Sequence, residues 1–170
     1  MTKGCYAEGK DGYCEYASKQ AFIIQNQYRA EKGIAPLIWS KELYNVSKIR
    51  SKELTKLYSH TRPNGDNCKE LFVEYFGKER CKIFQNSYRQ LTLSKGLNYV
   101  ISAQECYVEN AGCGNYGVLG IMHAWKSSPG HFKNISDTQN VSGSISCFIS
   151  SNNTEHWISS FVCVDVDNIK

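Results

Sequence analysis

Apolar positions in the first part of the chain repeat with the spacing of an amphipathic helix. Between residues 17 and 32 they recur every three to four positions, which places them on one face of a helix. Gly33 follows directly and is a typical C-terminal stop. The pattern predicts a helix over residues 17–32. The repeating positions are Ala17, Ala21, Ile24 and Tyr28.

A second helical pattern covers residues 41–58 and begins after Ser40, a residue type that caps helix N-termini. Its apolar face carries one charged residue, Arg50, which needs a partner if it is buried. Glu53 is a candidate partner because it lies three positions further along the same face. The apolar positions of this face are Leu43, Val46, Leu54 and Leu57.

The middle of the chain gives weaker signals. A short helix-like stretch covers residues 68–76, and residues 77–96 show no clean period. Residues 97–102 have the composition of a strand, whereas 106–117 contain Cys and Gly and resemble a loop. A helix is predicted over residues 118–126, before a turn-forming Ser-Ser-Pro sequence.

The last third changes character. Residues 141–150 and 155–166 alternate in polarity and are rich in β-branched and aromatic residues, with a turn-forming segment between them. This pattern predicts an antiparallel hairpin. Helices followed by strands indicate an α+β fold with helices packed on a sheet. We expect one domain over residues 17–166, preceded by an irregular leader over residues 1–16.

Composition and charge narrow the function classes. The 170 residues are 41% hydrophobic and 21% charged, which is typical of a globular domain. The net charge of +4 is spread along the chain rather than gathered in a basic run, which argues against a nucleic-acid partner. No apolar run approaches the roughly 20 residues of a transmembrane helix, so no transmembrane segment is expected.

The eight cysteines form an even set. Such a set favours disulfides and therefore a secreted, extracellular protein, because the cytosol keeps thiols reduced. Free core thiols or a zinc site are the alternatives, although no CxxC pair occurs. Eight cysteines allow 105 pairings, so the sequence leaves the connectivity open. Pairing of near neighbours, such as Cys106 with Cys113, is one guess. The cysteines are Cys5, Cys14, Cys68, Cys81, Cys106, Cys113, Cys147 and Cys163.

Five segments, in order along the chain, resemble those of a known family. They begin with Asn26-Gln27-Tyr28-Arg29 leading to Pro36-Leu37-Ile38-Trp39, followed by Arg50-Ser51-Lys52-Glu53-Leu54 with Ser59-His60-Thr61-Arg62-Pro63-Asn64-Gly65. Glu109-Asn110-Ala111, Ser128-Pro129-Gly130-His131-Phe132 and the aromatic segment Trp157 to Phe161 complete the set. Together they resemble the CAP superfamily of cysteine-rich secretory, antigen-five and pathogenesis-related proteins, and the segments around His60 and His131 are similar to its bacterial-type branch.

The resemblance implies a three-layer α-β-α sandwich whose cavity gathers two histidines and two acidic residues. By motif match, His60, Glu109 and His131 fill three of these places. The fourth falls on Ser128, so the full set is not present in this chain. His123 is a poor substitute, because five residues of separation point it about 140° away around a helix.

Two imidazoles and a carboxylate can hold a divalent metal such as zinc. The same groups without a metal can form a polar network that stiffens the sandwich. The resemblance also implies, for several branches, a lipid or sterol ligand, and we consider a host or cell-envelope protein as a further partner. We expect a non-catalytic binding or effector module. A metal-dependent, protease-like hydrolase using the same cavity is the alternative, although no G-x-S-x-G or H-E-x-x-H signature occurs.

Overall fold

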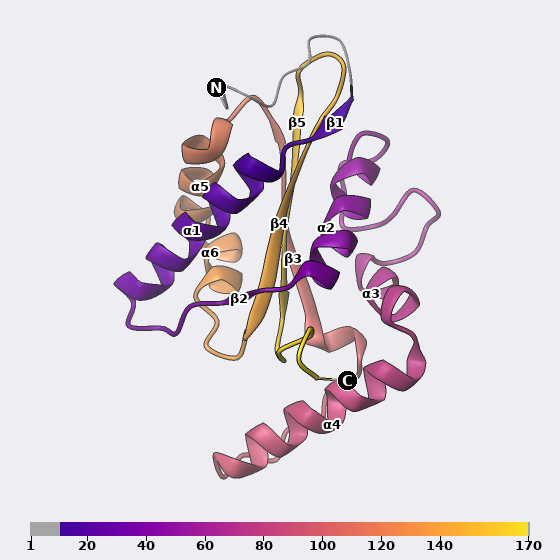
Figure 1. The fold of residues 1–170 in the computed structure, drawn as a ribbon, viewed down its shortest axis with the longest axis vertical. Coiled ribbons are helices and arrows are strands. Elements are labelled where there is room, and N and C mark those ends of the chain that lie inside the picture. Colours follow the sequence, from indigo (N-terminus) through magenta and orange to yellow (C-terminus); the bar gives the residue numbers. More distant parts are fainter. Residues whose placement is uncertain (1–10, 170) are drawn as a thin grey trace.

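A computed structural model describes residues 11–169 as three layers, with a central sheet between two groups of helices (Figure 1). The expected α-β-α arrangement is therefore confirmed. The elements in chain order are β1 (Gly12–Tyr13), α1 (Glu15–Glu31), β2 (Ile38–Trp39), α2 (Lys41–Glu53), α3 (Cys68–Phe76), α4 (Lys78–Ser94), a 3-10 turn (Gln104–Cys106), β3 (Tyr107–Gly114), α5 (Gly117–Ser127), α6 (Pro129–Ile135), β4 (Ser142–Ile149) and β5 (Glu155–Val162).

The sheet has the strand order β1-β4-β5-β3, and β2 adds a short parallel pairing to β4. The predicted hairpin is present as β4 and β5, with Ser142 opposite Val162 and Ile149 opposite Glu155. Every residue of both strands is buried. Helices on both faces explain this burial, because a covered sheet has no solvent-facing side.

Each face of the sheet has its own apolar core. Helices α1, α5 and α6 cover one face, where Trp125 and Trp157 are almost completely buried. On the other face, α2 and α3 lie over the sheet (Figure 1), and Phe72 stacks on Tyr107 with ring centroids 5.5 Å apart. Arg50, the charged residue on the apolar side of α2, is fully buried on this second face, with an exposure of 0%.

Most of the predicted helices are confirmed. Helix α1 begins at Glu15, α3 matches the short stretch 68–76, and α5 covers the segment predicted before the Ser-Ser-Pro turn. The second helix is shorter than predicted, because α2 ends at Glu53 rather than near residue 58. Ser40 caps α2 as expected, its hydroxyl accepting the Leu43 amide at 2.9 Å.

Three predictions in the middle of the chain were wrong. Residues 77–96 contain the long helix α4, whose buried positions Cys81, Phe84, Tyr88 and Thr92 do recur every three to four residues, so a helical period was present and was missed. The strand predicted over residues 97–102 is absent from the described chain, where this segment is irregular. The loop predicted over residues 106–117 is largely strand β3. A Cβ at Gly112 would lie 2.4 Å from Ile121, so this glycine permits close packing of α5 rather than marking a loop.

The cysteines depart from the expected disulfide set. Cys14 is disulfide-bonded, whereas Cys5 lies outside the described residues. The guessed pairing of Cys106 with Cys113 is wrong, because these residues stand at opposite ends of β3, roughly 20 Å apart along an extended strand. Six described cysteines are free thiols, namely Cys68, Cys81, Cys106, Cys113, Cys147 and Cys163.

The leader expected over residues 1–16 lies only partly within the described residues, which begin at position 11. Strand β1 follows directly at Gly12–Tyr13. No helix between residues 11 and 169 is long and apolar enough to cross a membrane.

Candidate functional site

Glu109 forms the base of the candidate site. It lies in β3, which is at one end of the strand order, and it pairs in register with Ser160 of β5. Side chains alternate along a strand, so Glu109 faces the same layer as Tyr107, toward α2 and α3. Only 5% of Glu109 is exposed. A buried carboxylate requires compensating donors, and the chain supplies several.

Arg50 of α2 is the main donor to this carboxylate. Its Nη2 lies 2.8 Å from Glu109 Oε1, and its Nε lies 3.2 Å from both carboxylate oxygens. The other end of the guanidinium binds Glu53 at 2.6 Å, which confirms the pairing predicted from the helix spacing. Arg50 Nη2 also donates to the carbonyl of Ser59, which ties the following loop to the helix.

The electrostatics of Glu109 follow from these contacts. Burial by itself would raise the pKa of Glu109, but hydrogen bonds from His60, Arg50 and Tyr107 together hold it below its ordinary value. The Tyr107 hydroxyl donates to Glu109 Oε2 at 2.7 Å. For Arg50, burial lowers the pKa, but the bonds to Glu109 outweigh it and the net shift is upward. At neutral pH the two groups therefore form a buried ion pair.

His60 reaches the carboxylate from the loop after α2. Its Nδ1 lies 3.2 Å from Glu109 Oε1, while 56% of the imidazole side chain is exposed. The loop is folded back on itself, because the Cys68 amide donates to the His60 carbonyl at 2.9 Å and Thr61 bridges to Asn67. His60 therefore stands between buried Glu109 and solvent.

Cys68 is brought to the same place by this loop. It is the first residue of α3 and is only 4% exposed. The ligand atoms of His60, Cys68 and Glu109 all lie within 4.8 Å of one another. Burial, followed by the nearby Glu109 charge, raises the pKa of the Cys68 thiol to about 12. The thiol is therefore protonated at neutral pH unless a cation replaces its proton.

His131 approaches from the opposite layer. It lies on α6, where its carbonyl accepts a hydrogen bond from the Asn110 side chain at 3.0 Å. Asn110 follows Glu109 in β3 and so points to the other face of the sheet. Burial, and then repulsion from His60, lower the pKa of His131. The two imidazoles are thus electrostatically coupled, but His131 is not part of the compact ligand group formed by His60, Cys68 and Glu109.

Two further positions from the sequence lie apart from this group. Ser128 stands at the junction of α5 and α6, where its carbonyl accepts the Phe132 amide at 2.8 Å. His123 is exposed on α5.

The sequence reasoning assigned Cys68 to a disulfide and gave Tyr107 no role. Two positions separate Tyr107 from Glu109, and this strand spacing could have indicated that they share a face.

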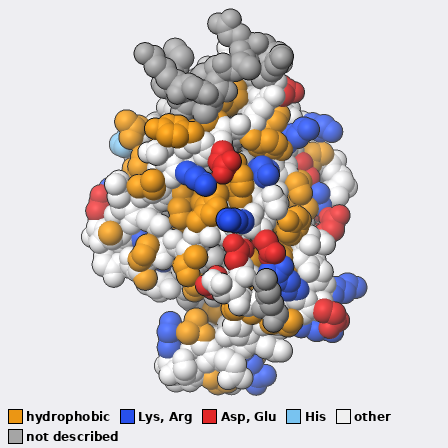
Figure 2. Space-filling view, in the orientation of Figure 1, with side chains coloured by type: hydrophobic (Ala, Val, Ile, Leu, Met, Phe, Trp, Pro, Cys, Tyr) orange, Lys and Arg blue, Asp and Glu red, His pale blue; other side chains and the backbone are white. Residues whose placement is uncertain are grey.

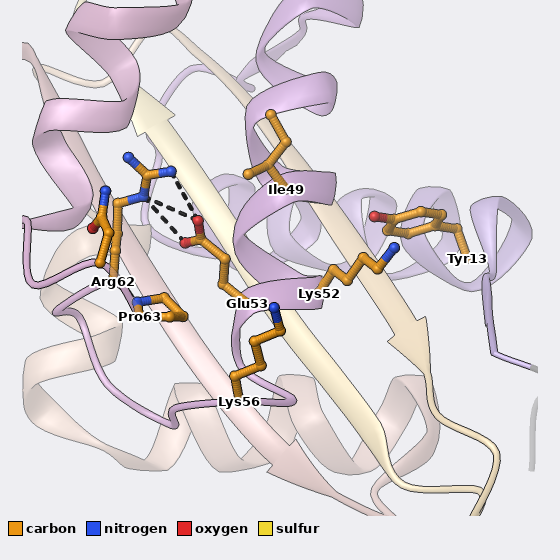
Figure 3. A pocket seen from close by; sticks show the side chains of 8 residues that line it. Tyr13, Ile49, Lys52, Glu53, Lys56, Arg62 and Pro63 are labelled. Carbon is orange, nitrogen blue, oxygen red and sulfur yellow. Dashed lines mark hydrogen bonds and ion pairs between the residues drawn. The ribbon is translucent and has the colours of Figure 1, made fainter.

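A charged hollow borders the site on the far side of Glu53. Figure 3 shows Lys52, Lys56 and Arg62 around it, with the Glu53 carboxylate bound by Arg62. The Arg62 Nη2 lies 2.9 Å from Glu53 Oε1. Glu53 therefore links Arg62, at the hollow of about 460 Å³, to Arg50, at the Glu109 site.

A smaller hollow of about 320 Å³ has a more apolar lining, with Phe22 and Ile23 from α1 and Trp39 from β2. Figure 2 shows apolar side chains gathered in the middle of the face on which α1 and α2 lie, with basic and acidic side chains around them. Neither hollow includes His60 or Glu109 in its lining. The candidate ligand group is therefore separate from both.

Comparison with known families decides the assignment. The sequence model of the cysteine-rich secretory protein family, CAP, matches residues 23–164. The chain belongs to the CAP family. The matched range includes His60, Glu109 and His131, together with α1 to β5 apart from the first residues of α1. A search of curated proteins gave no significant match.

Solved bacterial CAP-type structures share the fold. An outer surface protein of Borrelia burgdorferi has a TM-score of 0.68 at 14% identity, covering 91% of this chain and 97% of that protein. An extracellular SCP-domain protein of Bacillus anthracis has a TM-score of 0.61 at 15% identity and 86% coverage of this chain. A cysteine-rich secretory protein of Staphylococcus aureus has a TM-score of 0.57 at 11% identity and 96% coverage.

The relatives differ in length. This chain spans 40% of the Bacillus protein and 41% of the Staphylococcus protein. At these identities the likeness concerns the fold alone.

Proposed function

We propose that this CAP domain is a non-catalytic binding module whose His60, Cys68 and Glu109 side chains hold a divalent, thiophilic cation, with zinc the best chemical fit. The observation that carries the proposal is the convergence of three ligand atoms within 4.8 Å of one another. Imidazole, thiolate and carboxylate are all zinc ligands. An N, S and O donor set with a thiolate favours zinc over magnesium or calcium, which prefer oxygen ligands.

The spacing of the donors supports this choice. Two ligands at about 2.1 Å from a tetrahedral ion stand about 3.4 Å apart. The separation of His60 Nδ1 from Glu109 Oε1 is 3.2 Å, close to that value. A cation between them would replace the present hydrogen bond, while Arg50 and Tyr107 continue to hold the carboxylate. His131, whose pKa is lowered by burial and then by His60, is the next imidazole and lies in the opposite layer.

The same contacts favour binding over hydrolysis. A general base must be free to take a proton from water or substrate. Glu109 is 5% exposed and accepts bonds from Arg50, Tyr107 and His60. The role of Glu109 is therefore to orient the neighbouring side chains and to neutralise a bound cation. Turnover of peptide or ester substrates that is abolished by Glu109→Gln would contradict the non-catalytic part of the proposal.

An extracellular location is part of the proposal. The matched family is described as secretory, and the Bacillus neighbour is described as extracellular.

Calorimetric titration of zinc into the metal-free protein tests the site. We expect one binding event, strongly weakened by His60→Ala and by Cys68→Ser, and weakened less by His131→Ala. His123→Ala is the matched control, because it removes an exposed histidine outside the ligand group.

Cobalt titration adds a readout that folding defects do not imitate. Bound cobalt should show the ultraviolet charge-transfer absorption of a metal–thiolate bond, and Cys68→Ser should remove that band while circular dichroism stays unchanged. Absence of zinc binding to the folded wild-type protein would overturn the metal proposal. Zinc binding of unchanged affinity in Cys68→Ser would show that the Cys68 thiolate is not a ligand.

A further inference from the structure

Three buried cysteines meet in the core beneath α3 and α4, away from the His60 site. Cys106 ends the 3-10 turn before β3, Cys163 follows β5, and Cys81 lies on α4. Their exposures are 2%, 5% and 2%, and all three belong to the same apolar core. The proposed metal site uses none of them.

The sheet register sets Cys106 opposite Cys163. Tyr107 of β3 pairs with Val162 of β5 in an antiparallel ladder. One step beyond this pair, the Cys163 amide donates to the Cys106 carbonyl at 3.3 Å. The Cys163 thiol is also hydrogen-bonded to the Cys106 thiol. Residues directly opposite in such a ladder have Cβ atoms about 4.5 to 5.5 Å apart, and only a small adjustment brings them to disulfide distance.

The third thiol lies close by but comes from a different element. Cys81 is near enough to Cys106 for their charges to interact, and burial is the main reason that its pKa is raised to about 11. Its position on a helix gives it no register with either strand. Cys106 therefore has one partner fixed by the backbone and one held only by side-chain packing.

We propose that Cys106 and Cys163 form a disulfide when the chain meets a small-molecule disulfide oxidant, and that Cys81 remains a thiol. In this step the Cys106 thiolate displaces one thiol from the oxidant and forms a mixed disulfide. The Cys163 thiolate then displaces the second thiol. Two protein thiols lose two electrons and two protons, and one oxidant disulfide becomes two thiols. The exchange takes place during folding or local opening, because the folded core shields both sulfurs.

The bond would join the start of β3 to the end of β5 and close a loop of roughly 60 residues. It thereby fixes the strand that carries Glu109 at its open edge. The proposal is independent of metal binding, because its readout is a covalent bond.

Peptide mapping tests the assignment directly. The reduced protein is refolded with a mixture of glutathione and glutathione disulfide, free thiols are alkylated, and the protein is digested without reductant. We expect a peptide that links Cys106 to Cys163, with Cys81 alkylated after denaturation. Alkylation of both Cys106 and Cys163, or a link from Cys106 to Cys81 instead, would overturn the proposal.

Thermal unfolding supplies the second measurement. The oxidised protein should unfold at a temperature higher than the reduced protein, with a contribution from this bond on the order of 10 °C. The double variant Cys106→Ala/Cys163→Ala should lose that contribution, whereas Cys81→Ser and Cys113→Ser should retain it. An equal oxidation-dependent shift in the double variant would contradict the assignment. The peptide map of the wild type remains decisive if a variant fails to fold.

Discussion

Two arginines are buried on opposite faces of the sheet, and their surroundings differ in kind. Arg29 of α1 donates only to backbone carbonyls, those of Ala35, Ile135, Asp137 and Asn140. Arg50 of α2 binds the carboxylates of Glu109 and Glu53.

The pKa shifts reflect this difference. Burial lowers the pKa of Arg29, and the nearby Asp137 offsets it only in part. Burial also lowers the pKa of Arg50, but the carboxylates outweigh this effect, so that the pKa of Arg50 is raised overall. An arginine that binds neutral carbonyls, such as Arg29, ties backbone segments together. An arginine that binds buried carboxylates, such as Arg50, keeps those carboxylates ionised, so that they can act in a binding site. We infer that Arg29 is structural and that Arg50 supports the Glu109 site.

The largest expected effect is that of Arg50→Met. The substitution keeps an unbranched side chain but leaves the 5% exposed Glu109 without its cation. Removing one partner of a buried ion pair costs about 3 to 5 kcal/mol. Urea unfolding at pH 7 should show a loss of this size. Arg89→Met, an exposed position on α4, is the control and should change little.

The pH dependence of that loss separates charge from packing. In the wild type, Glu109 has a lowered pKa, so its contribution is present above the unfolded value near 4.3 and is lost as the pH falls through the folded pKa. Without Arg50 the pKa of Glu109 should instead rise. The difference between wild type and variant should therefore narrow as the pH falls from 7 toward 4. A constant difference would mean that lost packing, not charge, is responsible.

Arg29→Met should have a smaller effect. It leaves no unpaired charge but removes the donors of four carbonyls, which costs about 2 kcal/mol after water or local movement compensates some of them. Because carbonyls do not titrate, the loss should stay nearly constant between pH 4 and pH 7. Unfolding measurements across that range check it. A loss as large and as pH-dependent as that of Arg50→Met would remove the distinction between the two arginines.

The sequence predicted one side of this comparison better than the other. Helical spacing placed Arg50 on the apolar side of its helix and gave Glu53 as a candidate partner, because the two residues belong to one local element. The carbonyl partners of Arg29 come from loops and from the end of α6, at positions 6 to 111 residues away. No local pattern encodes such partners.

The candidate site shows the same limit. Motif likeness to the family indicated His60, Glu109 and His131, but the approach of Cys68 depends on how the loop after α2 folds back. That return is fixed by contacts such as the Cys68 amide to the His60 carbonyl. Strand β3 was missed because its glycines and cysteine resemble a loop locally, while its pairing with β5 is a long-range contact. Long-range pairing therefore limited both the fold prediction and the site prediction.

The smallest expected effect concerns the two imidazoles on opposite layers. Burial, and secondarily the His60 charge, lower the pKa of His131. His60→Ala should raise the pKa of His131 slightly, but leave it below its ordinary value because the burial remains. A folded-state pKa below the unfolded one means that His131 favours the folded state above about pH 6.5, and that this stability is lost as the pH falls through the folded value. Titration followed by NMR, with His123→Ala as control, measures the shift. An unchanged pKa of His131 in His60→Ala would show that the two imidazoles do not interact across the edge of β3.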